Sequence, residues 1–291
     1  MNVHVSETVD LQQAIAKLDA LPAMPAVARK LMMLDLDSDE GELQFRKLIE
    51  QDPLISAKLV GLANSPSYGS SRKIIAVSDA VLVLGMTRVR SIVFGITAMS
   101  SLTRFPEGKL KSQEVWMHSM SVAVAMSIIA HAMPVKIRPA DDQVFFAGLL
   151  HDIGYMALSY LDSKASNLLH EQLQSVPFSM SVSIEESVLG MSHAEIGALL
   201  AMHWHLPEEV IAVIRDHHKL EMTGITEYQI LVRLVQLAEK MLGEFCVNDH
   251  DGGTIAAEEW QALGINPDDA DDIRNSVCEV ATQAGQMAAA F

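Results

Sequence analysis

The chain has 291 residues and a formal net charge of −16, because 37 Asp and Glu residues outnumber 21 Lys and Arg residues. This excess of acid argues against a nucleic-acid-binding surface, since phosphate binding depends on a basic stripe that releases counterions. Apolar residues make up 49% of the sequence and charged residues 20%, which excludes a disordered chain and allows a large core. A chain of this length is typical of two domains of ~150 residues each.

The amino terminus and the cysteine content indicate a cytoplasmic protein. The first ten residues, MNVHVSETVD, lack the basic and apolar regions of a secretory signal. The least charged stretches, 91–102 and 119–135, contain Gly, Ser or His and fall short of the ~18–20 apolar residues of a bilayer span. The two distant cysteines, Cys246 and Cys278, form neither a disulfide framework nor a metal-binding spacing. We therefore expect no membrane span and a reducing compartment.

The spacing of apolar residues predicts helices along the chain. Apolar residues recur three or four positions apart, and strict alternation is rare. In chain order, such stripes lie within 54–62, 115–129 and 230–241. Asp52 and Pro53 mark the start of the first, because a carboxylate caps the first amides and proline tolerates the first helical position. The predicted fold class is all-α.

Two further helix starts lie in the second half of the chain. Ser192 and Glu195 have the spacing of a capping box, in which the two side chains satisfy two helix amides reciprocally. Pro207, followed by Glu208 and Glu209, predicts a helix with acids at its positive end.

Breaks in the helical pattern divide the chain. The segment RFPEGKLKS at 104–112 interrupts two long helical regions, and NDHDGG at 248–253 precedes an acidic, alanine-rich region. The predicted organisation is a tail over 1–14, an amino-terminal helical lobe over 15–106, a histidine-rich helical bundle over 107–245, and carboxy-terminal helices packed on the outside over 246–291.

Potential metal ligands concentrate in the 107–245 lobe. Glu114 and His118 lie four residues apart and share a helix face. The others are His151–Asp152, His193, His217–His218 and Glu239. Each has an ordinary explanation when taken alone, as a surface pair, a buried core histidine, a neighbour of a helix cap, or a histidine favoured at a helix carboxyl end.

Their joint occurrence favours a metal centre. The residues lie on separate helices of one lobe, and helical bundles assemble internal metal sites from facing side chains. His151 and Asp152 point about 100° apart on a helix, so one can bind a metal while the other bridges to a second, near the helix break that Gly154 predicts. Imidazole and carboxylate ligands suit Fe, Mn, Zn or Ni, and two ions ~3.5–4 Å apart activate a bridging water for phosphoester hydrolysis. The lack of a neighbouring cysteine argues against a thiolate zinc site.

Several segments of the chain, taken in order, carry a family pattern. They are LPAMP at 21–25, QDPLISAKLVGLANS at 51–65, SDAVLVLGMTRVRSI at 78–92, WMHSM at 116–120, FFAGLLHDIG at 145–154, MSHAEIGALLAMHWHLP at 191–207 and IRDHH at 214–218. Together they resemble the HDOD family, the HD-related output domain of bacterial signalling proteins, over about residues 15–245. The resemblance implies an all-α fold within the HD superfamily of metal-dependent phosphohydrolases, in a family viewed mainly as signalling or protein-interaction modules.

The histidines are also similar to those of the HD-GYP cyclic-dinucleotide phosphodiesterases, whose ligands follow the order Glu, His, His-Asp, His, His-His, Asp. Carried over in that order, the resemblance implies the ligands Glu114, His118, His151, Asp152, His193, His217 and His218, with Glu239 in place of the final Asp. The chain departs from the pattern in two further places. Tyr155 stands where those enzymes usually have a lysine that helps to hold phosphate, and no GYP segment follows His218.

These features predict a cytoplasmic bacterial signalling module that binds a signalling protein or a small phosphate-containing effector and holds one or two divalent metals, Fe, Mn, Zn or Ni. The alternative is an active metal-dependent phosphohydrolase acting on a nucleotide or cyclic dinucleotide, with Asp152 as a catalytic residue and a metal-bridging hydroxide as nucleophile. In that case Arg215 and Lys219 are the nearest candidate cations for the phosphate. A third possibility is a structural scaffold whose histidines only fill the core. Neither nucleic acid nor membrane is an expected partner.

Overall fold

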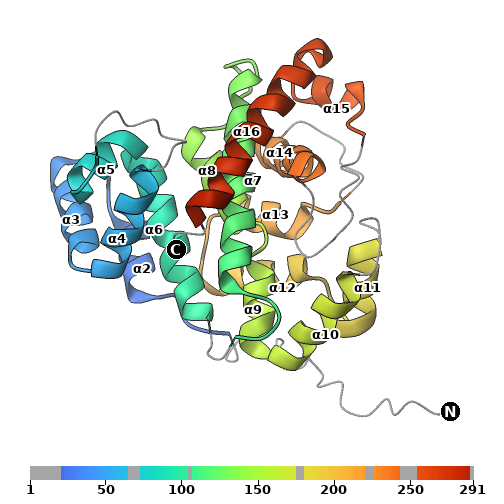
Figure 1. Cartoon of the computed structure of the whole chain (residues 1–291), viewed down its shortest axis with the longest axis horizontal. Helices are drawn as coiled ribbons and strands as arrows, with labels where there is room; N and C mark the ends of the chain where they lie inside the picture. Colours follow the sequence, from blue (N-terminus) through green and yellow to red (C-terminus); the bar gives the residue numbers. More distant parts are fainter. Residues whose placement is uncertain are drawn as a thin grey trace.

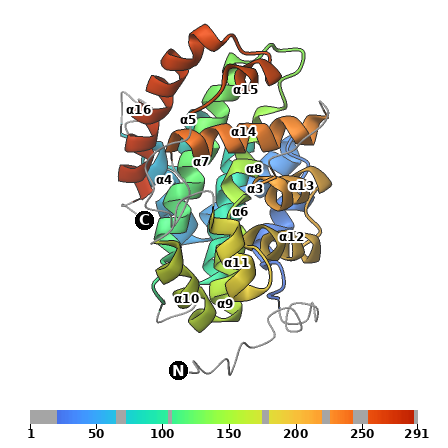
Figure 2. The same ribbon diagram turned by 90° about the vertical axis from the view of Figure 1, so that its right-hand side faces the viewer.

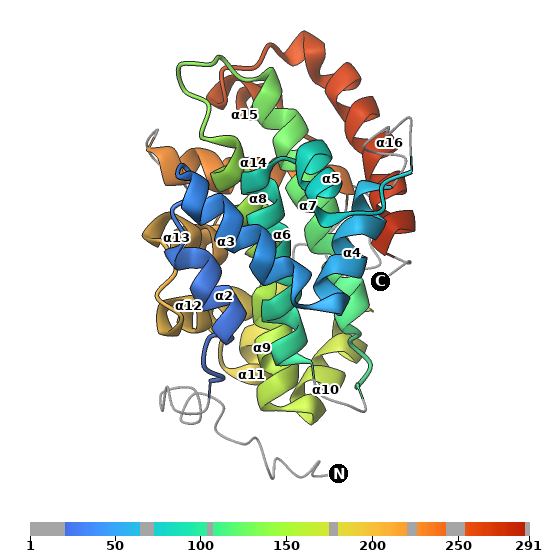
Figure 3. The same cartoon turned by 90° about the vertical axis from the view of Figure 1, so that its left-hand side faces the viewer.

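The computed structural model describes residues 21–64, 73–103, 107–174, 180–219, 226–242 and 254–288. Within these ranges the chain forms helices and no strand, which confirms the predicted all-α class. The amino-terminal helices are α2 (Ala26–Met33), α3 (Asp39–Glu50), α4 (Pro53–Ala63), α5 (Val77–Leu84) and α6 (Met86–Leu102). Helices α2, α4 and α5 pack against α6, and Figure 3 shows α2 to α4 in front of it.

The histidine-rich bundle follows α6 and surrounds the long central helix α7 (Figure 1). Its helices are α7 (Ser112–Ala132), α8 (Asp141–Leu150), α9 (Ile153–Leu161), α10 (Ser163–Leu173), α11 (Ser181–Leu189), α12 (His193–His203), α13 (Glu208–Asp216) and α14 (Glu227–Leu242). Helix α8 packs along α7, α9 packs against α12, and α13 lies between α12 and α14.

The carboxy-terminal helices cover the bundle from outside. They are α15 (Ala257–Ala262), a short 3-10 helix (Pro267–Asp269) and α16 (Ala270–Ala288). Helix α16 runs along α7 and also contacts α14 (Figure 2). Trp260, Leu263 and Ile273 are buried in a core that they share with α7 and α14. These helices therefore seal an apolar face of the bundle.

A larger core runs from the amino-terminal helices into the bundle. It includes Phe45 of α3, Phe94 of α6, Tyr155 of α9 and Ile214 of α13, each of which is almost completely buried. This core thus continues across the segment 104–112, where the sequence predicts a boundary. The division into separate lobes stays a prediction.

The helix starts follow the predicted capping chemistry. The Asp52 carboxylate accepts the N–H groups of Leu54 and Ile55 at 2.9 and 3.1 Å, where α4 begins with Pro53. At α12, the Glu195 amide donates to the Ser192 hydroxyl at 3.2 Å, and the Ser192 amide donates to the Glu195 carboxylate at 2.9 Å. Both predicted caps are confirmed.

Replacing Ser192 with alanine should lower the free energy of unfolding by about 1 kcal/mol, because the first turn of α12 loses a side-chain cap. The measurement is urea denaturation followed by circular dichroism. Ser183→Ala, an exposed position within α11, is the matched control and should change stability by less than about 0.5 kcal/mol. Equal stability of the two variants would contradict the assigned cap.

Two helical runs are longer and more apolar than expected from the sequence. By length and composition alone, Ser112–Ala132 and Asp141–Leu161 could each cross a membrane, and the bent pair α5 and α6 could make a third span. In the structure, 61% and 83% of the most apolar windows of the two runs are buried inside the protein. The expectation that every apolar stretch falls short of a bilayer span is therefore corrected.

Candidate metal centre

The His151–Asp152 pair lies in the short break between α8 and α9, at the centre of the bundle. Helix α8 ends at Leu150 and α9 begins at Ile153, so the pair joins two helices. Gly154 has a different role from the predicted helix break. A Cβ atom there would lie 1.8 Å from the His193 carbonyl oxygen, so glycine allows α9 and α12 to approach closely.

One group of potential ligands draws on α7, the α8–α9 break and α14. It consists of His118, His151, Asp152 and Glu239, and one ligand atom from each lies within 4.8 Å of all the others. The Oδ2 atom of Asp152 lies 3.4 Å from Nε2 of His118 and 3.3 Å from Nε2 of His151. The Oε1 atom of Glu239 lies 3.4 Å from Nε2 of His151. The longer side chain of Glu239 therefore reaches the group.

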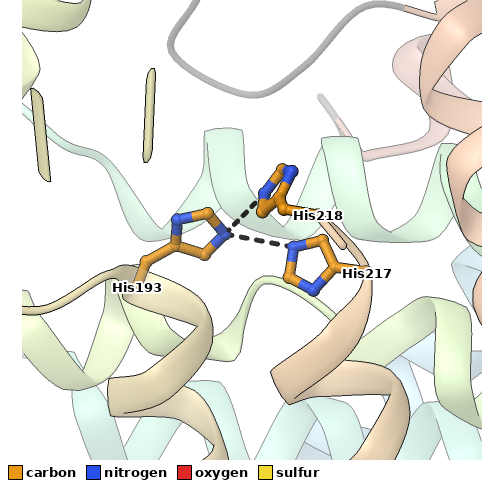
Figure 4. A group of neighbouring side chains, drawn as sticks. All are labelled: His193, His217 and His218. Atoms are coloured by element: carbon orange, nitrogen blue, oxygen red, sulfur yellow. Dashed lines mark hydrogen bonds between the residues drawn. The ribbon is translucent and has the colours of Figure 1, made fainter. Parts of the chain in front are cut away.

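A second group consists of three imidazoles from the start of α12 and the end of α13. Nε2 of His193 lies 3.1 Å from Nε2 of His217 and 3.2 Å from Nε2 of His218 (Figure 4). The structure thus brings together three of the histidines that the resemblance implies as metal ligands.

Asp152 connects the two groups. Its Oδ1 atom lies 3.2 Å from Nε2 of His193 and 3.6 Å from Nε2 of His217, while its Oδ2 atom faces His118 and His151. The two oxygens of one buried carboxylate therefore face different sets of imidazoles. This arrangement suits a carboxylate that bridges two metal ions.

Hydrogen bonds on the far side of the rings fix their orientation. Nδ1 of His151 lies 2.7 Å from the Gly148 carbonyl, and Nδ1 of His217 lies 2.8 Å from the Ile214 carbonyl. A carbonyl only accepts hydrogen bonds, so each Nδ1 carries the proton, and in the neutral ring the Nε2 lone pair faces the group. Metal-binding histidines are commonly held in this way.

The buried polar atoms of the site fit a metal ion. His151 Nε2, both Asp152 carboxylate oxygens and Glu239 Oε1 are buried and have no hydrogen-bond partner among the described residues. Leaving a buried polar atom without a hydrogen bond costs about 1–3 kcal/mol, and more when the atom is charged. Divalent cations coordinated by these atoms would offset that cost, so the residues fit the group that the resemblance implies.

The electrostatics of the site's own side chains show how strongly it favours positive charge. Burial opposes a charge on His151, yet Asp152 and Glu239 raise its pKa to about 10. Burial would raise the pKa of Asp152, but the adjacent imidazoles hold it well below its usual range. Burial lowers the pKa of His118 to about 4. Burial, and then the neighbouring imidazoles of His217 and His193, hold the pKa of His218 well below its usual value. A buried anionic centre is thus surrounded by histidines, not all of which can be protonated.

Glu185, which the sequence analysis did not identify, supports the second group from behind. Its carboxylate is fully buried in α11 and lies 2.8 Å from Nδ1 of His193. It also accepts the His193 amide N–H at 2.8 Å and the Tyr155 hydroxyl at 2.7 Å. The Tyr155 ring stacks on the His193 ring with centroids 4.1 Å apart. Tyr155, at the position where the HD-GYP pattern has a lysine, thus helps to hold the His193 ring from behind.

Replacing Glu185 with glutamine should weaken metal binding about 10–100-fold, because the variant loses the anionic acceptor that orients and polarises His193. Equilibrium titration of the chelator-treated protein with Zn²⁺, measured by competition with a fluorescent chelator, provides the affinity. Glu186→Gln, at the exposed neighbouring position, is the matched control and should bind Zn²⁺ like the parent chain. If both variants bind equally, Glu185 does not orient a ligand.

The remaining predicted site residues lie outside the two groups. Glu114 is exposed on α7, one turn before His118. The Arg215 guanidinium and the Lys219 ammonium both pair with the Asp216 carboxylate, at 2.9 and 2.7 Å. Their predicted contacts with a phosphate therefore require them to leave this carboxylate or to share it, and their catalytic role stays a prediction.

Comparison with known proteins gives the family. A sequence model of the HDOD domain matches residues 21–220. The chain is 26% identical over 239 residues to an uncharacterized protein of Treponema pallidum (strain Nichols), a match that covers 80% of this chain and 44% of that protein. It therefore spans less than half of this relative.

Solved structures share the fold. A proposed signal transduction protein from Marinobacter aquaeolei VT8 is 25% identical with a TM-score of 0.79, and the match covers 96% of this chain and 64% of that chain. An HDOD domain protein of unknown function from Geobacter sulfurreducens is 24% identical (TM-score 0.74; 96% and 98% covered). A proposed phosphohydrolase from Shewanella amazonensis SB2B is 21% identical (TM-score 0.69; 96% and 97% covered). Since the family model covers more than half of the chain, this protein belongs to the HDOD domain family, as its motifs predicted.

Proposed function

We propose that this chain is a cytoplasmic signalling module of the HDOD family that holds one or two divalent transition metals and binds a partner protein or small effector. One observation carries the metal assignment: Nε2 of His151, both carboxylate oxygens of Asp152 and Oε1 of Glu239 converge in the core without hydrogen-bond partners among the residues that the structure describes. Bound metal would supply a Lewis acid there, and this chain's residues would hold and shield it.

The signalling part of the proposal rests on family membership and on a relative. The HDOD model matches residues 21–220, and the Marinobacter protein, of which this chain spans 64%, is described as a proposed signal transduction protein. A partner-binding module needs no turnover, which agrees with the pairing of Arg215 and Lys219 with Asp216.

A second candidate function, metal-dependent phosphohydrolysis, is favoured by the position of Asp152. A carboxylate whose two oxygens face separate groups of ligands suits a two-metal centre, and such centres activate water for attack on phosphate esters. In this case His118, His151, Asp152 and Glu239 would hold one ion, and His193, His217 and His218 would help to hold another. The lysine that holds phosphate in the related phosphodiesterases is replaced by Tyr155, whose hydroxyl donates to Glu185.

The metal content of the purified full chain tests the shared part of both functions. Plasma mass spectrometry should detect about one equivalent or more of Fe, Mn, Zn or Ni per chain. Less than about a tenth of an equivalent, unchanged after reconstitution with each metal, would exclude both metal-dependent functions.

Turnover separates the two functions. The metal-loaded chain is incubated with bis-p-nitrophenyl phosphate and with a panel of nucleotides and cyclic dinucleotides. The signalling module is expected to release no product above the metal-only control. Metal-dependent turnover that disappears on chelation would instead establish the phosphohydrolase.

A further inference from the structure

A cavity of about 170 Å³ lies between the amino-terminal helices and the bundle, away from the metal-binding groups. Helix α6 contributes Arg90 and Phe94, and α8 contributes Asp142 and Phe146. The start of α13 contributes Glu209 and Val210, and α14 contributes Leu231. The cavity is therefore built from helices on both sides of the segment 104–112.

The inner wall of the cavity is apolar. The Phe94 and Phe146 rings meet edge to face with centroids 5.1 Å apart. Phe94, Val210 and Leu231 are buried, at 0–4% exposure. Ligand pockets typically measure ~300–1,000 Å³, so this smaller cavity suits a ligand of only about ten non-hydrogen atoms with an apolar part.

The charged residues of the cavity carry both signs. The Arg90 guanidinium lies 3.5 Å from the Asp142 carboxylate, which is longer than the ~2.7–2.9 Å of a strong charge-assisted hydrogen bond. Glu209 adds a second, exposed carboxylate. One cation beside two carboxylates disfavours a phosphate dianion. The set complements a zwitterion, whose carboxylate can pair with Arg90 and whose ammonium group can pair with the acids.

We propose that this cavity binds an apolar α-amino acid of about the size of leucine. The α-carboxylate binds Arg90 in place of the long contact with Asp142, and the ammonium group lies between Asp142 and Glu209. The side chain packs against Phe94 and Phe146. Each part of the ligand thus meets a group of matching chemistry on the cavity wall.

The cavity is placed to influence the metal-binding groups. Asp142 lies in the first turn of α8, which leads to His151, and Glu209 lies in the first turn of α13, which leads to His217. At 1.5 Å per residue, each ligand-binding residue is about 12–14 Å from the corresponding histidine along its helix. A ligand that holds α6, α8 and α13 together therefore fixes two of the helices that position imidazoles. This coupling, unlike the binding itself, rests on the metal site proposed above.

Isothermal titration calorimetry with leucine and the full chain tests the binding. We expect leucine to bind, and both 4-methylpentanoate, which lacks the ammonium group, and isoamylamine, which lacks the carboxylate, to bind at least about tenfold more weakly. Arg90→Gln and, independently, the exposed Glu209→Gln should each weaken leucine binding by a similar factor. Lys136→Gln, an exposed position outside the cavity, is the control and should leave it unchanged.

The proposal is overturned if neither leucine nor another apolar amino acid binds the parent chain, or if Arg90→Gln and Glu209→Gln bind leucine as tightly as Lys136→Gln. The coupling is tested by titrating leucine into metal-loaded and chelator-treated protein. Affinities that differ by about threefold or more support it, because linkage between two binding sites is reciprocal. Equal affinities overturn the coupling but not the binding of leucine. If the chain retains no metal and still binds leucine, the proposed metal site fails while the proposed leucine site stands.

Discussion

Replacing Asp152 with alanine is expected to reduce the metal content of the purified chain from about one equivalent or more to less than about a tenth. Asp152 is 0% exposed, and its two oxygens face His118 and His151 on one side and His193 and His217 on the other. Alanine removes the carboxylate from both groups at once. A metal at the three histidines of the second group then has only neutral ligands there, and a metal in the first group keeps Glu239 as its one anionic ligand.

Asp152→Asn separates charge from shape. Asparagine keeps the volume of the side chain, so this variant should fold like the parent chain and still lose most of its metal, because an amide is a weaker ligand than a carboxylate. Asp271→Asn, at an exposed position of α16, is the matched control and should retain full metal content. Plasma mass spectrometry after gel filtration provides the measurement. Normal metal content in both Asp152 variants would show that the metal is bound elsewhere.

Replacing Gly154 with alanine is expected to lower the free energy of unfolding by about 3 kcal/mol or more. The added Cβ atom would lie 1.8 Å from the His193 carbonyl oxygen and 2.9 Å from the Gly197 amide nitrogen. Both are backbone atoms of α12, so no side-chain rotation relieves the overlap. The helices α9 and α12 must separate, which also moves His193 away from its group.

A second glycine supplies the control for this variant. Gly61 lies in α4 and is exposed, and apart from the backbone of its own helix no described residue comes within 4 Å of the position that a Cβ atom would take. Gly61→Ala should therefore stabilise the chain by about 0.5–1 kcal/mol, the usual gain for alanine over glycine in a helix. Urea denaturation of the two variants gives both values. A Gly154→Ala chain as stable as the parent would show that α9 and α12 do not approach as closely as described.

The sequence identified the helices and most of the groups at the site. Apolar periodicity and caps such as Asp52 and Ser192 depend only on neighbouring residues, and the structure confirms them. The candidate ligands around His151 and Asp152 followed from their residue types and from the family pattern, but spacing along the chain contains no distance between separate helices. The structure brings seven of the eight proposed metal ligands into two groups and leaves Glu114 exposed, four residues before His118.

The residue that supports His193 from behind could not be predicted from the sequence in the same way. Glu185 precedes His193 by eight residues, yet it meets His193 only because the chain turns at Gly190, between the end of α11 and the start of α12. Its only sequence signal is a single acid on a mainly apolar helix face, with Ile184, Val188 and Leu189 as neighbours. Arg215 and Lys219 differ from Glu185, because their partner is close in the sequence. The Asp216 carboxylate lies between them along the chain and forms an ion pair with each.

By itself, the sequence determined the helical class, the caps and the family, since these depend on local propensity and on ordered motifs. Only the tertiary structure decided which side chains meet. The close approach of α9 and α12 at Gly154, the break at His151–Asp152 and the packing of α14 against α7 bring residues from distant segments within a few ångströms. Helix crossing and burial set those distances, because the packing of one helix against another depends on the whole core.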